Sequence, residues 1–398
     1  MLTPTRQKLH SKLLLIKLLH IFNYPDSRGL LTFCPMPLHS VVGHHETRRR
    51  LARGVRSKRL PQVLVLAGPW GVGKQRLALW LAQLVLCEAA GEEPCGSCRA
   101  CRLVGGLAHP DLHWFVPIPR PKASETDKQV EEASQAIADA MEERRSRPLY
   151  AQSDGMASHG IASVRLLQRQ AALTSVEGGR RVFIIGEADR LVSQESSQEA
   201  ANALLKLLEE PPPGSLFVLT TVDAQRLLPT IRSRAVLLRV GGIADPDVRG
   251  FLAAHLRPAP SAAELDQRVA AAEGSIGRAL AVGDESGKAQ HAAERLLDAV
   301  MAGPGPSFEQ ALKQAPWSAR GDFTAMLDAL AETLSEAARE TLGQTPRRPV
   351  PRALRGYGHP DRLLKAMEHV ADARDAAWGN VNPQILLAVL GEELAEIL

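Results

Sequence analysis

The stretch that decides the fold is Gln62 to Ala78, QVLVLAGPWGVGKQRLA. Its apolar start, Val63 to Ala67, predicts a buried β-strand, and the residues after Lys74 follow a helical pattern. Between the two lies a glycine-rich turn, GPWGVGK, from Gly68 to Lys74. Glycines at such a turn let backbone N–H groups converge on phosphate oxygens, and the lysine adds a positive charge. The stretch therefore predicts a phosphate-binding loop between a strand and a helix.

Two positions depart from what a hydrolysing site needs. Ser or Thr follows the lysine in such loops and holds Mg²⁺ through its hydroxyl, but here the residue is Gln75. A later strand pattern, Val182 to Ile185, should end in one carboxylate for Mg²⁺ and one to polarise water, yet Gly186 and Glu187 follow it. Asp189 could partly substitute, although the sequence favours its being a solvated acid at a helix start. Both metal-holding groups are missing, which argues against efficient ATP hydrolysis.

Composition sets only broad bounds on the protein class. The chain has 398 residues, enough for two or three domains, with 45% hydrophobic and 23% charged residues. Aromatic residues make up only 4%, and the abundance of Ala and Leu favours helix over sheet. The net charge of +4 is too small to indicate nucleic-acid binding by itself. No uncharged apolar run approaches the length needed to span a bilayer.

Four of the five cysteines form a cluster with the spacing Cys87-x7-Cys95-x2-Cys98-x2-Cys101, and Cys34 stands apart. Clustered cysteines in an intracellular chain indicate a metal rather than disulfides, and four thiolates can close a tetrahedral Zn²⁺ site. An iron–sulfur cluster is the rival, because a Cys-x2-Cys-x2-Cys run also binds such clusters. The upstream position of Cys87 favours structural zinc, without an open position for catalysis.

Strand and helix patterns alternate from residue 62 to 240, which predicts a parallel sheet covered by helices, hence an α/β fold. We expect this nucleotide-binding-type domain to span residues 36–241, followed by a small helical domain at 242–290 and a second, all-α block at 291–398. Within the first domain, 117–160 reads as a charged surface insertion outside the core. Residues 1–35 read as an extension or a misassigned start.

A further segment, LLPTIRSRA, places Arg234 just past a strand–helix unit. An arginine in that position can act as an arginine finger on the γ-phosphate of a nucleotide held by a neighbouring subunit. A surface ion pair is the competing interpretation, and the local sequence alone favours it.

The motifs share an order with a known family. They are VVGHHE from Val41, the GPWGVGK loop, the four cysteines, HPDLHWF, NALLKLLEEPP and LLPTIRSRA. In this order they resemble bacterial clamp-loader subunits of the AAA+ superfamily, which belong to DNA polymerase III. The resemblance implies an AAA+ domain with an inserted zinc module (87–101), a helical lid and an oligomerising collar. It also implies a cytoplasmic five-subunit ring with gamma/tau and delta subunits, which uses ATP to place a sliding clamp on primer–template DNA.

The resemblance assigns roles to individual residues. Ser233 and Arg234 correspond to the finger motif, with Ala235 in place of cysteine, so Arg234 would complete the ATP site of an adjacent subunit. Sensor 1 falls on Thr220 or Thr221, and the sensor-2 arginine falls near Gly277, one place before Arg278. The resulting expected nucleotide contacts are Gly68, Gly71, Gly73, Lys74, Gln75, Glu187 and Thr221.

Within this family the chain could be a stator that binds nucleotide without hydrolysing it or an active ATPase of the gamma/tau type. Gln75 and Gly186 both weaken turnover in cis, while Arg234 remains available in trans. The combination favours the stator. A metal-binding adaptor with a vestigial nucleotide site is a further alternative.

Overall fold

The computed structural model describes residues 38, 40–89, 91–147, 149, 157–177, 179–191, 197–281, 284–316, 322–346, 348–377 and 381–398. The predicted extension at 1–35, with Cys34, lies outside these residues. By their contacts, Leu38 to Leu398 cluster into one unit. Within the described ranges, no helix combines the length and the apolarity needed to cross a membrane.

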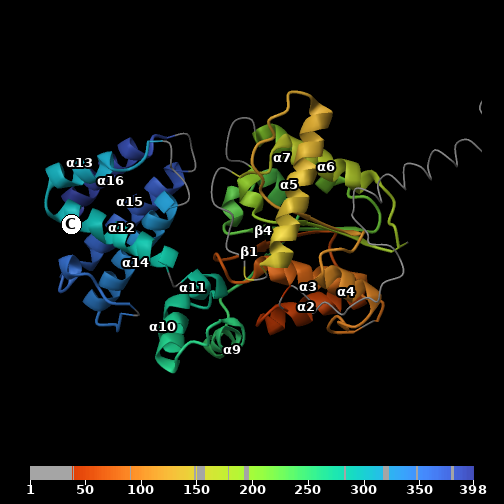
Figure 1. Ribbon diagram of the computed structural model, residues 1–398, viewed down its shortest axis with the longest axis horizontal. Coiled ribbons are helices and arrows are strands. Elements are labelled where there is room, and N and C mark those ends of the chain that lie inside the picture. Colours follow the sequence, from red (N-terminus) through yellow and green to blue (C-terminus); the bar gives the residue numbers. More distant parts are fainter. Residues whose placement is uncertain are drawn as a thin grey trace, which may run out of the picture. The chain divides into compact units, whose positions relative to one another are not determined.

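Five parallel strands form one sheet in the order β2-β3-β4-β1-β5 (Figure 1). The strands are β1 Val63–Ala67, β2 Leu112–Phe115, β3 Arg181–Ile185, β4 Ser215–Thr221 and β5 Val236–Arg239. The predicted strands at 63–67 and 182–185 and the parallel sheet are confirmed. Because the strands are parallel, the loop after β1 and the Gly186–Glu187 turn after β3 emerge at the same edge of the sheet.

Helices cover both faces of the sheet. In order they are α2 His45–Arg56, α3 Lys74–Leu86, α4 Arg99–Gly105, α5 Thr126–Ser146, α6 Ile161–Ala172, α7 Ser197–Glu209 and α8 Pro229–Arg232. One core contains Leu64, Leu66 and Val218 with residues of α2 and α3. The alternate strand residues, including Phe183 and Phe217, pack with α6 and α7. Side chains on a strand point alternately to opposite faces, so the continuous apolar runs fill two cores.

Helix α5 differs from the expectation of a surface insertion outside the core. Val130 and Ala133 are buried, and Ala133 belongs to the core on the α3 side of the sheet. Ile137 and Met141 are partly buried against it. These four positions recur at helical spacing and form one narrow apolar stripe, which is sufficient to anchor a mostly charged helix.

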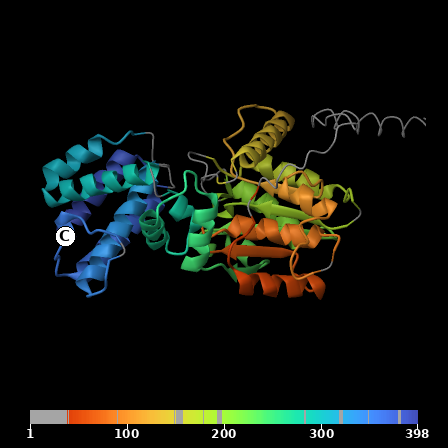
Figure 2. The ribbon, with the colours of Figure 1, turned by 60° about the horizontal axis from the view of Figure 1, so that its bottom comes forward.

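The rest of the chain is helical, as predicted (Figure 2). A three-helix segment contains α9 Asp245–His255, α10 Ala262–Ala272 and α11 Ile276–Ala281. The C-terminal helices are α12 Asp284–Met301, α13 Pro304–Leu312, α14 Asp322–Thr341, α15 Pro360–Ala376 and α16 Pro383–Ile397. The two groups have separate apolar cores. Because α12 runs from 284 to 301, the predicted boundary at residue 290 falls inside a helix.

Aromatic stacking across the sheet gives a test of this core. The ring of Phe217 is fully buried and stacks on Phe183 at 4.9 Å between centroids. Phe217→Ala should lower the free energy of unfolding by about 3–5 kcal/mol, because it leaves a cavity that the sheet cannot fill. Phe308→Ala, at a residue that is 57% exposed, should cost less than about 1 kcal/mol. Equal losses in urea denaturation would contradict this account of the core.

Candidate nucleotide site and metal centre

The phosphate-binding loop has the backbone that its glycines predict. Gly71 and Gly73 lie in the left-handed region, with φ of 75° and 89°, and α3 begins at Lys74. At Gly68 an added Cβ would lie 2.0 Å from the Val240 carbonyl oxygen, so only glycine allows the loop to pass the end of β5. From the VVGHHE segment, the Nε2 of His44 lies 2.7 Å from the Val72 carbonyl, to which it can only donate.

The lysine of the loop is turned back on the loop itself. Its Nζ donates to the carbonyl oxygens of Gly68, at 2.8 Å, and Pro69, at 2.7 Å. The side chain is buried, and this desolvation lowers the pKa of Lys74 to about 8, against the opposing effect of the Asp189 and Glu187 carboxylates. Two of the three lysine donors are therefore spent on carbonyls beside the place where a phosphate would bind.

The three-helix segment lies directly on the loop. The backbone N–H of Gly277 donates to the Gly71 carbonyl at 3.0 Å, and the Ser275 hydroxyl donates to the Trp70 carbonyl at 2.9 Å. A Cβ added to Gly277 would lie 2.6 Å from the Gly71 Cα, which is closer than any side chain allows. The start of α11 thus packs directly against the phosphate-binding turn.

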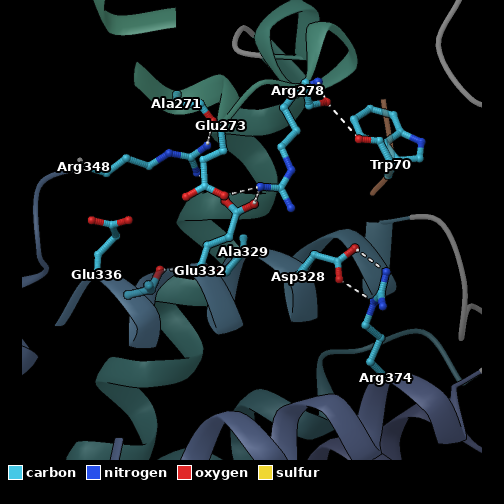
Figure 3. Close-up of polar contacts among 12 residues, drawn as sticks. Trp70, Ala271, Glu273, Arg278, Asp328, Ala329, Glu332, Glu336, Arg348 and Arg374 are labelled. Carbon is cyan, nitrogen blue, oxygen red and sulfur yellow. Dashed lines mark hydrogen bonds and ion pairs between the residues drawn. The ribbon is translucent and has the colours of Figure 1, made fainter. Parts of the chain in front are cut away.

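Arg278, the expected sensor-2 candidate, has acidic partners on two elements. Its guanidinium lies 2.7 Å from the Glu273 carboxylate and 3.7 Å from that of Glu332 on α14 (Figure 3). Glu332 also pairs with Arg348, which donates to the Ala271 carbonyl at 3.1 Å. The side chain of Arg278 is committed to this ion-pair network, while its backbone N–H binds the Ser275 hydroxyl.

Gln75 and Gly186 are packed against each other. A Cβ at Gly186 would lie 3.2 Å from the Cδ and Nε2 atoms of Gln75, so the glutamine fills the space that a side chain at 186 would need. Gln75 Nε2 also lies 3.5 Å from a Glu187 carboxylate oxygen. The departures at Gln75 and Gly186 are therefore structurally linked. The side-chain amide of Gln75 lies between the phosphate-binding loop and the end of β3, in the space that glycine at position 186 leaves.

Glu187 is sequestered by a neighbour that the sequence did not single out. The Nε of Arg190 lies 3.0 Å from its carboxylate, and both side chains are largely buried. Glu187 itself has a φ of 53°, in the left-handed region. Its backbone N–H donates to the Thr220 hydroxyl at 3.1 Å. The carboxylate expected to orient an attacking water is thus held in an ion pair with Arg190.

Buried His159 supports the same turn. Its Nε2 lies 2.6 Å from the Gly186 carbonyl and must carry the proton, since a carbonyl only accepts. Burial lowers the pKa of His159 to about 4, so the ring is neutral at physiological pH. Neither His159 nor Arg190 lies in a recognisable motif, and only their place in the fold shows their role.

The two threonines proposed for sensor 1 point to opposite faces of β4. Thr220 contacts the backbone of Glu187, as described above, whereas the Thr221 hydroxyl donates to the Asp223 carbonyl at 2.8 Å. Consecutive strand residues alternate in direction, so only one of the two can face the strand end of β3. That residue is Thr220, and the expected nucleotide contact at Thr221 belongs to a turn instead.

The four cysteines do come together. The Sγ atoms of Cys87, Cys95, Cys98 and Cys101 all lie within 4.8 Å of one another. A tetrahedral site with metal–sulfur bonds of about 2.3 Å has sulfur–sulfur edges of about 3.8 Å, and Cys95 and Cys101 are 3.9 Å apart. The set could therefore bind a metal ion.

The surroundings of the sulfurs also suit a metal site. The backbone N–H groups of Cys98 and Cys101 donate to the Sγ atoms of Cys95 and Cys98, each at 3.3 Å. The N–H of Cys98 is the main cause that lowers the pKa of Cys95, to about 6, whereas burial raises the pKa of Cys87 and Cys101. The latter two thiols would lose their protons on binding a cation.

Arg234 lies at the surface beyond α8. Its guanidinium is 2.7 Å from the Glu209 carboxylate at the end of α7 and 3.0 Å from the Thr230 carbonyl. Its side chain is 36% exposed and Glu209 is 45% exposed, so water screens the pair. The ion pair that the sequence left as an alternative is therefore present, and both partners remain accessible.

A parallel sheet, a glycine-rich loop at the end of β1 and a helix that begins at the loop lysine define an α/β protein of the P-loop class. Within that class, the chain belongs to the family described as "DNA polymerase III, delta subunit", which matches residues 43–243, about half of the chain.

Individual relatives agree with this family. The chain is similar to the DNA polymerase III subunit delta' of Bacillus subtilis, with 32% identity over 188 residues, which are 47% of this chain and 44% of that protein. It is 28% identical to subunit delta' of Escherichia coli over 67% of this chain and 69% of that protein. The chain thus spans less than half the length of the Bacillus relative.

The subunit tau of Escherichia coli is 28% identical over 63% of this chain and 33% of that protein. Among solved structures, a DNA polymerase III gamma subunit-related protein of Thermotoga maritima is 14% identical, with a TM-score of 0.36, over 88% of this chain and 98% of that one.

The packing of Gln75 against Gly186 predicts a coupling between two substitutions. Gly186→Asp alone should destabilise the protein by about 1–3 kcal/mol, because the new side chain overlaps Gln75. In a Gln75→Ser background the space is free, so the same substitution should cost at least about 1 kcal/mol less. Thermal or urea unfolding of the four proteins measures this coupling. An identical cost in both backgrounds would refute the contact.

The cysteine cluster predicts a resident metal. The purified chain should be colourless and carry about one equivalent of zinc by elemental analysis, as expected for four thiolate ligands. Cys98→Ser should lower the zinc content well below that value, whereas Ser233→Ala, at an exposed residue outside the cluster, should leave it intact. A brown protein that absorbs visible light and contains iron would instead identify an iron–sulfur cluster.

Proposed function

We propose that this chain is a delta-prime-type stator of a DNA polymerase III clamp loader, a subunit that helps place the sliding clamp on primed DNA without hydrolysing ATP. One observation carries the proposal above all. The chain's own phosphate-binding loop is packed tightly against the start of α11 at Gly277, whereas Arg234 lies exposed at the surface. A subunit built in this way is suited to complete a neighbour's ATP site rather than its own.

Three changes oppose turnover in cis. Lys74 donates to its own loop, Gln75 occupies the space beside Gly186, and Arg190 neutralises Glu187. Phosphoryl transfer needs a metal that bridges the phosphates and a group that orients the attacking water. The local contacts support neither role, so any nucleotide bound here would be held without being hydrolysed.

Arg234 is the group proposed to act in trans. Its only acidic partner among the described residues is Glu209, and an exposed pair of this kind contributes at most about 1 kcal/mol. A γ-phosphate offers more acceptor oxygens and a larger charge than one carboxylate, and arginine binds phosphate bidentately. On assembly, the phosphate of a neighbouring gamma/tau subunit would replace Glu209 as the partner of Arg234.

The C-terminal helices are proposed as the collar that holds the ring together. Apolar side chains are exposed on the adjacent helices α13 and α16 and on Val381, which lies two residues before α16. They are Phe308, Leu312, Val381, Ile385 and Val389, each at least 40% exposed. An apolar stripe that spans two packed helices is typical of a surface that another subunit covers. The gamma/tau and delta subunits are the proposed partners, with clamp and DNA bound through the complex.

The zinc module and the nucleotide site have supporting roles in this proposal. Four thiolates would hold a structural Zn²⁺ beside α4, with every coordination position taken by protein. The region 36–241 would be the AAA+ domain, and α9–α11 would be its lid, fixed on the loop rather than swinging with nucleotide.

Removal of the finger tests the proposal in the reconstituted complex. Arg234→Ala should leave assembly with gamma/tau and delta intact and slow hydrolysis at the adjacent ATP site by about 10³-fold or more, the usual contribution of an arginine finger. Arg232→Ala, two residues away, is the matched control and should retain turnover. Unchanged single-turnover hydrolysis in the Arg234→Ala complex would refute the finger.

ATPase assays of the purified chain alone decide between a stator and an active ATPase. If the chain were an active ATPase of the gamma/tau type, it would hydrolyse ATP alone and Lys74→Ala would abolish that activity. We expect no difference between the chain and its Lys74→Ala variant in the absence of partners.

A further inference from the structure

The positive charge of the chain is concentrated in one short segment. Residues 45–59, HETRRRLARGVRSKR, contain six arginines and one lysine but a single glutamate, a net charge of +6. Since the whole chain carries +4, the remaining residues sum to −2. The mild overall charge therefore conceals a strongly basic helix, α2, and two basic residues, Lys58 and Arg59, that follow its C-terminus.

One face of α2 fixes the helix to the domain. Leu51 and Ala52 are buried in the core shared with α3. Arg48 also points inward, where its guanidinium pairs with Glu93 at 2.6 Å and lies 5.3 Å from the centre of the Trp80 ring. The indole N–H of Trp80 donates to the same carboxylate at 2.7 Å. These contacts set the rotation of the helix, so its outer face is determined as well.

The outer face is basic and has little acid to neutralise it. Its exposed residues are Arg49, Arg50, Arg53, Arg56, Lys58 and Arg59, named here the α2 basic face. Arg49 and Arg53 share Glu46, each at 3.8 Å, with all three side chains at least 65% exposed. Arg56 pairs with exposed Glu92 at 2.9 Å. In the described ranges, no carboxylate lies within 4.0 Å of Arg50, Lys58 or Arg59. Screened pairs of this kind are readily exchanged for a stronger anion.

We propose that the α2 basic face binds the phosphate backbone of DNA. At a rise of about 1.5 Å per helical residue, Arg49 to Arg56 spans about 10 Å, along which a duplex presents about six phosphates, and Lys58 and Arg59 follow in the turn after the helix. Arginine forks match phosphate geometry, and the face contains five arginines to one lysine. Among the described residues, none of the large exposed apolar side chains falls within 45–59, so the face lacks the anchors that protein or membrane partners require.

This inference goes beyond the proposed stator role, because it gives the chain a direct and sequence-independent contact with DNA. The contact is separate from the phosphate-binding loop and from Arg234, and it requires neither partner subunits nor nucleotide. Its predicted signature is a steep dependence of DNA affinity on salt, since each phosphate contact releases bound counterions.

The test uses the full chain and a short fluorescent DNA duplex. Anisotropy titrations between about 50 and 200 mM salt give the slope of log affinity against log salt concentration. The triple variant Arg49→Ala, Arg53→Ala, Arg59→Ala should reduce that slope by nearly 3, about 0.9 for each lost phosphate contact, and lower affinity at least about tenfold at low salt. Alanine favours helix, so α2 should persist.

The control variant loses the same charge elsewhere. Arg352→Ala, Arg362→Ala, Lys365→Ala removes three exposed basic residues near or on α15 and should keep the salt slope of the parent chain. Circular dichroism should show equal helix content in both triple variants. Equal slopes for the two variants, or no DNA binding by the parent chain at low salt, would overturn the proposal. Binding to phosphatidylserine vesicles without binding to DNA would also overturn it.

Discussion

The close contact between Gly277 and Gly71 is the constraint on which the rest of the site depends. Neither residue has a Cβ, so two backbones approach where a single methyl group would keep them apart. This approach allows the Gly277 N–H and the Ser275 hydroxyl to donate hydrogen bonds to the Gly71 and Trp70 carbonyls of the loop. Buried carbonyls need partners, and here the chain itself supplies them. The phosphate-binding turn is thereby fixed by packing against the start of α11.

The substitutions below the loop follow the same principle. A nucleotide site holds a metal between a hydroxyl and a carboxylate, whereas here Gln75 fills that region and Gly186 leaves room for it. Glu187 keeps its negative charge near the loop, but the buried guanidinium of Arg190 compensates for it. Lys74, Gln75 and Glu187 all have polar partners within the protein, supplied by backbone carbonyls, by Glu187 and by Arg190 respectively.

Local patterns predicted the elements of the fold well and their contacts poorly. The strand at 63–67, the glycine-rich turn, the parallel sheet and the cysteine cluster could all be predicted because each depends on residues close in sequence. Thr221 was named as a nucleotide contact instead of Thr220, because the sequence alone does not show which face of the sheet each of two consecutive strand residues occupies. The contribution of α5 to the core was missed because a stripe of four apolar residues is diluted by charged neighbours.

The sequence by itself determined that a phosphate-binding loop exists, that its metal-holding residues are absent and that four thiolates lie within one short segment. Only the tertiary structure decided that α11 packs against the loop, that Gln75 and Gly186 compensate for each other and that Arg278 pairs with Glu273 and Glu332. The reason is physical. Residue type and spacing fix backbone geometry and ligand chemistry, but access to a site depends on segments about 200 positions away in the chain, whose approach is set by packing.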